Sequence, residues 1–166
     1  MKRRLALALL AARRWMLAGD PEAVYPYSSP EKFFSDRLNI SAEMIALAQA
    51  NHPQHSFIHS DICNWKSDEN FDFILAWDSL FHLPFSMQKP VLKKLCQTLN
   101  HHGVLIYSFG DDYGEHSGQW HNDTFYCSAI GLRENCQFLF NMELSIFHLE
   151  LDQFPEKHAY IISQKR

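Results

Sequence analysis

The sequence predicts an α/β domain in which helices cover both faces of a largely parallel β-sheet. Helical and strand-like segments alternate from residue 39 onward, the strand-like segments are almost continuously apolar, and no repeat or low-complexity tract interrupts them. Strands that are apolar along their whole length are typical of parallel sheets buried between helices. With 166 residues, of which 46% are hydrophobic and 20% charged, the chain can form one domain with a proper core.

A helix is expected directly after Asn39. Ser41 can accept a hydrogen bond from the first free N–H groups of this helix, and Glu43 suits the positive end of the helix dipole. An apolar stripe follows. The helix should end before Pro53, because the residue before a proline disfavours the helical conformation.

Three strands and a second helix are expected in the middle of the chain. A short strand covers residues 56–59, and residues 71–77 form a nearly uninterrupted apolar run. Residues 86–99 carry apolar side chains at helical spacing, and Asn100-His101-His102-Gly103 ends that helix. Residues 103–109 are apolar again and predict another buried strand.

The last third of the chain is expected to close the sheet with an antiparallel pair of strands. Residues 110–123 are polar and contain glycine, which predicts a loop, and a helix follows at about 129–140. Residues 143–153 and 158–163 read as two strands joined by the turn Pro155-Glu156-Lys157. Two strands joined by a short turn pair antiparallel.

Three motifs follow one another between residues 39 and 78. They read Asn39-Ile40-Ser41-Ala42-Glu43-Met44-Ile45, then Phe57-Ile58-His59-Ser60-Asp61-Ile62, then Phe71-Asp72-Phe73-Ile74-Leu75-Ala76-Trp77-Asp78. In this order and spacing the chain resembles the class I S-adenosylmethionine-dependent methyltransferases, over about residues 39–165. The resemblance implies a Rossmann-like sheet, S-adenosylmethionine as cofactor, and methyl transfer to an acceptor that we expect to be a small molecule.

The resemblance also implies which residues contact the cofactor. Asn39 stands where the family has an acidic residue that binds the ribose hydroxyls; an amide can hydrogen-bond there but lacks the charge. Met44 matches the apolar residue against adenine, although it could equally be a plain core residue. Asp61 matches the carboxylate that takes the adenine amino group, and its alternative role is a turn cap. The implied cofactor-binding residues are Asn39, Ile40, Met44, Asp61, Ile62 and Trp77.

Asp78 and His82 follow the strand expected at residues 71–77. This strand corresponds to the family's fourth strand, after which its active-site motif lies. Ligands of open α/β sheets bind beyond the carboxyl ends of the strands, so these side chains should face the methyl donor and acceptor. Methyl transfer is an in-line displacement that depends mainly on alignment, and a base is needed only when the acceptor must lose a proton. Asp78 or His82 could be that base; alternatively, His82 packs in the loop against Pro84. Glu115 and His116 are expected to contact the substrate.

The N-terminal segment departs from the family pattern. Residues 1–38 contain one glycine, Gly19, so the first strand and the glycine loop that holds the cofactor's methionine end are degenerate or missing. We therefore divide the chain into an atypical segment, 1–38, and a methyltransferase-like domain, 39–166.

A compensated frameshift would explain this segment. When the codons of residues 14–22 are read from the last base of each codon, they permit Leu-Asp-(Val or Ala)-Gly-x-Gly-(Ser or Pro)-Gly, which is the family's cofactor loop. On this hypothesis residues 1–38 are unselected sequence, and the sheet lacks its central strand and exposes apolar edges.

Composition and charge exclude several other classes of protein. The net charge of −4 argues against a general nucleic-acid footprint. The basic residues 2–4 precede an apolar run of only residues 5–12, too short to span a membrane and without a clean signal-peptide cleavage site; a short amphipathic helix is the expectation there. The four scattered cysteines predict reduced thiols in a cytoplasmic protein.

Three alternatives to an active methyltransferase remain. A non-catalytic pseudoenzyme or binding module on the same fold is favoured by Asn39 and by the absent glycine loop. A metal protein is disfavoured, because His55 and His59 lie on a probable strand where their spacing is too wide for one ion, and no metal is expected. A nucleotide-binding oxidoreductase is disfavoured because its glycine fingerprint is also missing.

Overall fold

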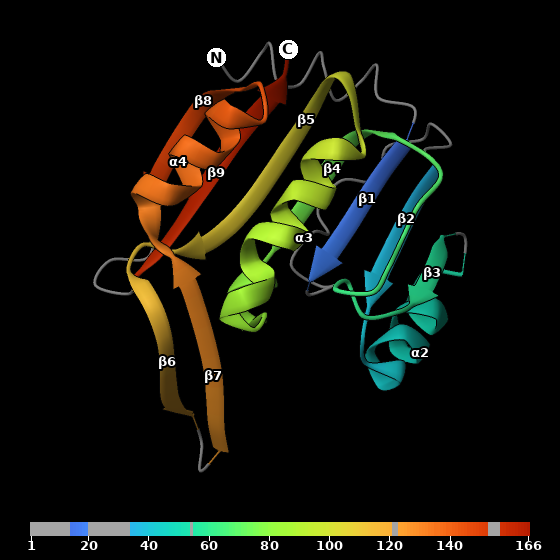
Figure 1. Cartoon of the computed structure of the whole chain (residues 1–166). Coiled ribbons are helices and arrows are strands. Elements are labelled where there is room, and N and C mark those ends of the chain that lie inside the picture. Colours follow the sequence, from blue (N-terminus) through green and yellow to red (C-terminus); the bar gives the residue numbers. More distant parts are fainter. Residues whose placement is uncertain (1–13, 20–33, 54, 121–122, 153–156) are drawn as a thin grey trace.

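The computed structural model describes residues 14–19, 34–53, 55–120, 123–152 and 157–166. Its centre is a seven-stranded sheet with the strand order β3-β2-β1-β4-β5-β9-β8 (Figure 1). β1 to β5 are parallel, whereas β9 is antiparallel to both β5 and β8. The strands are β1 (Arg14–Gly19), β2 (Phe34–Asn39), β3 (Ser56–His59), β4 (Phe71–Trp77), β5 (Leu99–Gly110), β8 (Leu144–Leu151) and β9 (His158–Lys165).

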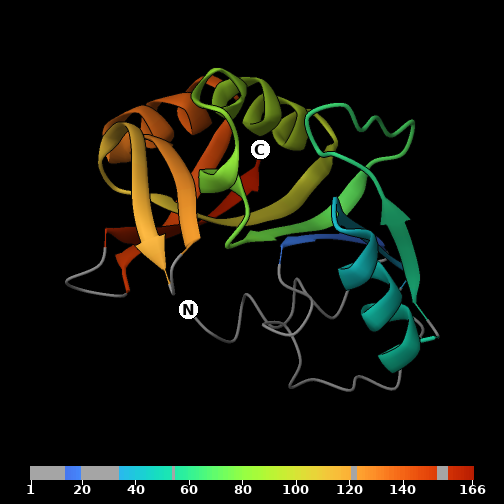
Figure 2. The ribbon, with the colours of Figure 1, turned by 90° about the horizontal axis from the view of Figure 1, so that it is seen from below.

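Helices lie on both faces of this sheet, as predicted. In the described residues, α2 (Ala42–Asn51) covers one face, and α3 (Phe85–Gln97) and α4 (Gly131–Asn141) cover the other (Figure 2). The Oγ atom of Ser41 accepts a hydrogen bond from the N–H of Met44 at 3.2 Å, so the predicted helix cap is confirmed.

A first strand is present at the position where we expected one to be degenerate or missing. β1 lies between β2 and β4, with Ala18 paired to Leu38 and Gly19 paired to Trp77. The expectation of a sheet that lacks its central strand is therefore wrong. The expected N-terminal amphipathic helix at residues 5–12 lies outside the described residues.

The main core lies between the sheet and the pair α3 and α4. Side chains of α3 and of the central strands meet there, and the core is completed by α4 and β8. The opposite face carries a smaller cluster around Phe73 and Val104. Nearly continuous burial along β4 confirms the prediction of a parallel strand covered on both faces. Fully buried members of the main core include Phe71, Ile74, Val91, Leu95, Leu105, Leu139 and Ile161.

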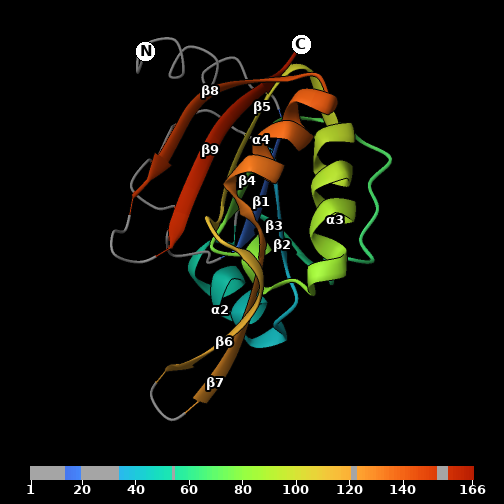
Figure 3. The ribbon, with the colours of Figure 1, turned by 60° about the vertical axis from the view of Figure 1, so that its left-hand side comes forward.

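The expected loop at 110–123 is instead most of a β-hairpin. β6 (Tyr113–Trp120) pairs antiparallel with β7 (Asp123–Ile130), and the hairpin projects beyond the end of the sheet (Figures 1 and 3). Because both faces of the projecting part are solvated, β6 does not need the apolar alternation by which strands are recognised. Sequence patterning therefore missed it.

The remaining helices and strands lie close to their predicted positions, and the largest difference is at the start of β5. α3 ends at Gln97, and β5 begins at Leu99, four residues before the expected start at 103. The pairing of β4 with β5 changes register between Phe71 and Phe73, and His102 has a φ of 64°, so the start of β5 bulges. The antiparallel pair β8–β9 is confirmed. The predicted turn falls largely on residues 153–156, outside the described residues.

Candidate functional site

One edge of the sheet collects the carboxyl ends of the parallel strands. Strand pairing puts His59 beside Asn39, Gly19 beside Trp77, and Ser108 beside Tyr160. The neighbouring pairs of β1 with β2 and of β4 with β5 place all of these residues in one row across the sheet. The hairpin β6–β7 and α2 flank this edge, which is where open α/β sheets bind ligands (Figure 1).

Asp78 lies at this edge in a hydrogen-bonded array. Its backbone N–H donates to Oγ of Ser108 at 2.8 Å, and the Ser108 hydroxyl donates to Oδ1 of Asp78 at 3.2 Å. Nε2 of His158 lies 3.0 Å from the same Oδ1, and Nδ1 of His158 contacts Oδ1 of Asp152. His158 therefore has a carboxylate at each ring nitrogen.

Exposure divides this array into a buried support and an accessible end. The side chain of His158 is 10% exposed and that of Asp152 is 20% exposed, whereas that of Asp78 is 41% exposed. Asp78 has a φ of 47°, a left-handed conformation that is uncommon outside glycine. Strained backbone of this kind clusters at functional sites.

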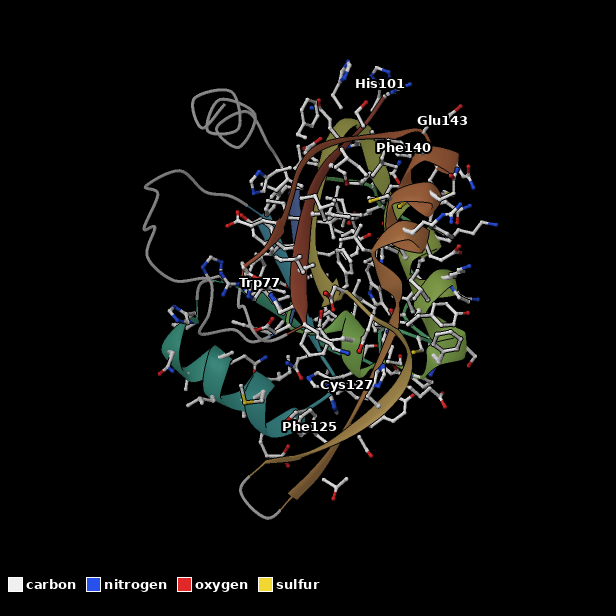
Figure 4. The ribbon with its side chains drawn as sticks, turned by 90° about the vertical axis from the view of Figure 1, so that its left-hand side faces the viewer. Trp77, His101, Phe125, Cys127, Phe140 and Glu143 are labelled. Carbon is white, nitrogen blue, oxygen red and sulfur yellow. The ribbon has the colours of Figure 1, made fainter. Side chains whose placement is uncertain are left out.

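Trp77 packs between two hydrogen-bonded aromatic groups of β9. Its ring centroid lies 5.8 Å from that of His158 and 5.4 Å from that of Tyr160. The Tyr160 hydroxyl donates to Oε2 of Glu150 at 2.9 Å, and burial together with this hydrogen bond raises the pKa of Tyr160. Nε2 of His148 lies 2.8 Å from the same oxygen of Glu150. Figure 4 shows Trp77 on the sheet face opposite α4.

His82 is held against the hairpin rather than in the array. It belongs to the short helix η1 (Leu80–His82), and its Nδ1 lies 3.2 Å from the carbonyl oxygen of Tyr126. Within the described residues no hydrogen bond joins His82 to Asp78. The ring of Phe81 makes T-shaped contacts with the rings of His82 and His158, at centroid distances of 4.5 and 6.1 Å.

Glu115 and His116 are used within the hairpin and its base. Glu115 accepts a hydrogen bond from the Tyr126 hydroxyl at 2.8 Å, and that hydroxyl accepts one from the N–H of Phe85 at the start of α3. His116 lies 3.2 Å from Oδ2 of Asp112. Both side chains support the hairpin, and the structure does not bring them together with Asp78.

A buried polar network fixes the hairpin to the domain. The side-chain amide of Gln88 donates to the carbonyl oxygens of Leu80 and Ser128 at 2.7 and 2.9 Å. The Ser128 hydroxyl donates to the carbonyl of Leu83 at 2.6 Å. The base of the hairpin is therefore tied to the segment that follows Asp78.

Asn39 and its neighbours form the turn between β2 and α2. Oδ1 of Asn39 accepts a hydrogen bond from the N–H of Ser41 at 2.8 Å, and the carbonyl of Asn39 accepts one from the N–H of Ser60 at 3.0 Å. Ile40 is exposed, and its carbonyl oxygen lies 2.8 Å from Nε2 of His59. Met44 is half-buried on the first turn of α2.

The segment after β3 carries Asp61 and Ile62. Oδ1 of Asp61 accepts from the N–H of Cys63 at 2.8 Å, and Oδ2 accepts from the side-chain amide of Asn64 at 3.1 Å. Asp61 thus caps the turn that it begins. Each carboxylate oxygen has a second lone pair and can accept another hydrogen bond.

Lys94 of α3 holds the same segment through three hydrogen bonds. Its ammonium group donates to the carbonyl oxygens of Ile62, Cys63 and Trp65 at 2.7, 3.1 and 2.7 Å. Three donors meet three acceptors, so the hydrogen-bonding capacity of the ammonium group is filled. Burial lowers the pKa of Lys94.

Sequence reasoning missed Ser108, Asp152 and His158. All three belong to the C-terminal half. Ser108 reaches Asp78 because β5 lies beside β4, whereas His158, which contacts Asp152, reaches it through the antiparallel placement of β9 beside β5. The available signal was the row of polar residues at strand ends: Ser108 near the end of β5 and His158 at the start of β9.

In the described part of the chain, no helix is long and apolar enough to cross a membrane. No group of three or more His, Cys, Asp or Glu side chains in that part could hold a metal ion.

Comparison with protein families links the middle of the chain to a known domain. Residues 36–103 match the family described as "Methyltransferase domain". A trans-aconitate 2-methyltransferase of Escherichia coli O7:K1 is 35% identical over 78 residues, which are 47% of this chain and 30% of that protein. The matched stretch thus spans less than a third of that relative.

Solved structures extend the likeness to the whole fold. An S-adenosylmethionine-dependent methyltransferase from Clostridium acetobutylicum superposes with a TM-score of 0.76 at 12% identity, covering 99% of this chain and 88% of its own. An amino pentose methyltransferase from Micromonospora echinaspora, solved with S-adenosylmethionine bound, gives 0.75 at 12% identity with the same coverage. Because both sequences are only 12% identical to this chain, these two comparisons show a shared fold and nothing more.

The fold and the family match point to the same class of protein. The chain has the α/β fold of the class I S-adenosylmethionine-dependent methyltransferases, and the resemblance to that class is confirmed. The match to the methyltransferase domain family covers residues 36–103.

Proposed function

We propose that this protein is an S-adenosylmethionine-dependent methyltransferase that acts on a small-molecule acceptor. The cofactor would bind along the carboxyl edge of β1 to β4, and the acceptor would lie between Asp78 and the hairpin β6–β7. The observation that carries the proposal is the accessible carboxylate of Asp78, held by Ser108 and His158 at this edge.

The residues at the edge fit the adenosine half of the cofactor. The Asn39 side chain would meet the ribose hydroxyls, and Asp61 keeps acceptor capacity for the adenine amino group beyond its two turn-capping hydrogen bonds. Met44 and Ile62 supply half-buried apolar neighbours for the ring. The methionine half would lie near Gly19, at the carboxyl end of β1.

Asp78 is the residue that would handle the acceptor's proton. The bound cofactor supplies an electrophilic methyl group on a sulfonium sulfur. Alignment of the acceptor with that group is the main requirement, and Trp77 and the hairpin would hold the acceptor there. An acceptor that loses a proton during transfer would pass it to Oδ2 of Asp78, because Oδ1 already receives the hydrogen bonds of Ser108 and His158.

Calorimetry with S-adenosylhomocysteine and S-adenosylmethionine tests the cofactor site. Saturable binding to the folded chain is the expected result, and no binding by a folded, monodisperse sample would overturn the proposal. Transfer of a tritiated methyl group would then be followed into trans-aconitate, the acceptor named for the relative, and into a panel of small amines and phenols.

Variants test the role of Asp78. Asp78→Asn should lower the transfer rate roughly 10²-fold or more and leave S-adenosylhomocysteine affinity unchanged, since general base catalysis contributes on that scale. Asp68→Asn is the matched control, because Asp68 is an exposed carboxylate in the segment before β4. Equal rates in the two variants would remove Asp78 from the mechanism.

A non-catalytic binding protein on the same fold is the second candidate. It is supported by the absence of glycine between residues 20 and 33 and by an amide, not a carboxylate, at Asn39. Cofactor binding without transfer to any acceptor in the panel would favour this candidate.

The proposed setting is the cytoplasm. The four cysteines are free thiols in the structure, as the scattered spacing predicted, and a cytoplasmic enzyme keeps its thiols reduced.

A further inference from the structure

We propose that His158, held by Asp152, is the positioning residue of the methyl-transfer site: it fixes the Asp78 carboxylate through a hydrogen bond to Oδ1 and leaves Oδ2 for the acceptor. The inference rests on the proposed function, because Asp78 matters to an acceptor only if the edge of the sheet is a methyl-transfer site. It adds to that function a residue of β9 and a residue that follows β8, two strands that lie beyond β5 in the order of the sheet.

The contacts of His158 fix the direction of its imidazole ring. Its side chain is nearly buried, and its two ring nitrogens face Asp78 and Asp152. The rings of Trp77 and Phe81 contact the imidazole at centroid distances of 5.8 and 6.1 Å. A ring packed by two aromatic side chains and hydrogen-bonded at both nitrogens has one orientation.

The two carboxylate oxygens of Asp78 differ in their hydrogen bonds. Oδ1 is shared by the Ser108 hydroxyl at 3.2 Å and His158 Nε2 at 3.0 Å, whereas Oδ2 has no hydrogen-bond partner among the described residues. The backbone N–H of Asp78 is also tied to Ser108. The Asp78 carboxylate is therefore held in place through Oδ1, and Oδ2 is available to the acceptor.

Both ring nitrogens of His158 meet a carboxylate oxygen. Nε2 lies 3.0 Å from Oδ1 of Asp78, and Nδ1 contacts Oδ1 of Asp152. Hydrogen bonds in which one partner is a carboxylate are among the stronger ones, so the two contacts hold the imidazole and the Asp78 carboxylate in place.

The remaining ionisable groups near His158 form a separate cluster. Glu150 and His148 of β8 hydrogen-bond with each other and with Tyr160 of β9. Lys157, next to His158 in the chain, pairs with Asp112 at 2.9 Å. Asp78 and Asp152 are thus the carboxylates in direct contact with His158 in the described part of the chain.

The test is nuclear magnetic resonance of the full chain with ¹⁵N-labelled histidine at constant pH, in the presence of saturating S-adenosylhomocysteine. The His158 signals are assigned from their loss in His158→Gln. Asp78→Asn should change the ¹⁵N chemical shift of His158 Nε2, and Asp152→Asn that of Nδ1, because each substitution replaces the carboxylate that faces that nitrogen. Glu150→Gln is the matched control and should change the signals of His148 only.

Calorimetry on the same samples separates this inference from the proposed function. S-adenosylhomocysteine affinity within about twofold of the parent in Asp152→Asn, together with the changed chemical shift of His158 Nδ1, supports the positioning role. Binding of S-adenosylhomocysteine with unchanged His158 ring-nitrogen shifts in all three carboxylate variants overturns it while the proposed function stands. Failure of the parent chain to bind S-adenosylhomocysteine overturns the proposed function itself.

Discussion

Nε2 of His158 lies 3.0 Å from Oδ1 of Asp78, although the two residues are 80 positions apart in the chain. Strand order explains the contact. β5 alone separates β4 from β9, and Gly110, the last residue of β5, pairs with His158. Asp78 leaves the end of β4 at the level of Ser108, so its carboxylate reaches across the end of β5. Ser108 bridges the gap because its hydroxyl both accepts from and donates to Asp78.

Ser108→Ala should destabilise the protein by about 1–3 kcal/mol, because the Asp78 N–H loses its acceptor while its backbone stays in the left-handed conformation. Urea unfolding measures the change. Ser117→Ala, on the exposed part of the hairpin, is the control and should be nearly neutral. Equal stabilities of the two variants would show that the Ser108 bridge does not hold Asp78.

Lys94→Met should destabilise the protein and weaken binding of S-adenosylhomocysteine. The substitution leaves three carbonyl oxygens of the segment after β3 without their ammonium donor, at a cost of about 1–3 kcal/mol. Lys93→Met changes the adjacent, exposed lysine and is the matched control. Unfolding and calorimetry measure the two effects; unchanged affinity in Lys94→Met would mean that this segment does not hold the cofactor.

Gln88→Met should loosen the base of the hairpin. The buried amide of Gln88 satisfies the carbonyls of Leu80 and Ser128, and a thioether of similar length cannot donate to them. We expect a loss of about 2 kcal/mol and faster amide hydrogen exchange at the base of β6 and β7. Gln137→Met alters an exposed glutamine of α4 for comparison. Unchanged exchange would disprove the anchoring role.

Local patterns predicted β3, β4 and α2 well, but they did not predict β1, which pairs with β2 and β4 in the parallel half of the sheet. The bounds of β3 and β4 match the expected strands, and the cap at Ser41 was read from residue type alone. The hairpin was missed because β6 is solvated and polar. The array around Asp78 was missed because His158 reaches it only through the antiparallel insertion of β9, which no local pattern near Asp78 reports.

The frameshift hypothesis for residues 1–38 makes a prediction at the level of the gene. The coding DNA of residues 14–22 should contain, in the shifted frame, the codons for a Gly-x-Gly-x-Gly loop. A chain with that frame restored should bind S-adenosylhomocysteine more tightly than the present chain, because backbone N–H groups of such a loop form a cradle for the ligand. Codons that cannot encode these glycines would end the hypothesis.

Cys96 should make the protein less stable at alkaline pH. Its thiol is fully buried on α3, and burial raises the pKa of Cys96 from 9.0 to about 12. A folded-state pKa above the unfolded value means that the folded chain binds the proton more tightly. The resulting stability is complete below pH 9 and is lost as the pH rises toward 12, by up to about 1.4 kcal/mol per pH unit.

Thermal unfolding between pH 8 and pH 10.5 measures this contribution in the parent chain and in Cys96→Ala. Cys96→Ala should be less stable at pH 8, because it leaves a small cavity, but should lose less stability as the pH rises. Cys127→Ala removes a half-buried thiol of the hairpin and should change the slope less, since burial raises the pKa of Cys127 as well but leaves its thiol partly in water. Parallel pH profiles for the parent and Cys96→Ala would show that the Cys96 thiol ionises no less readily in the folded chain than in the unfolded one.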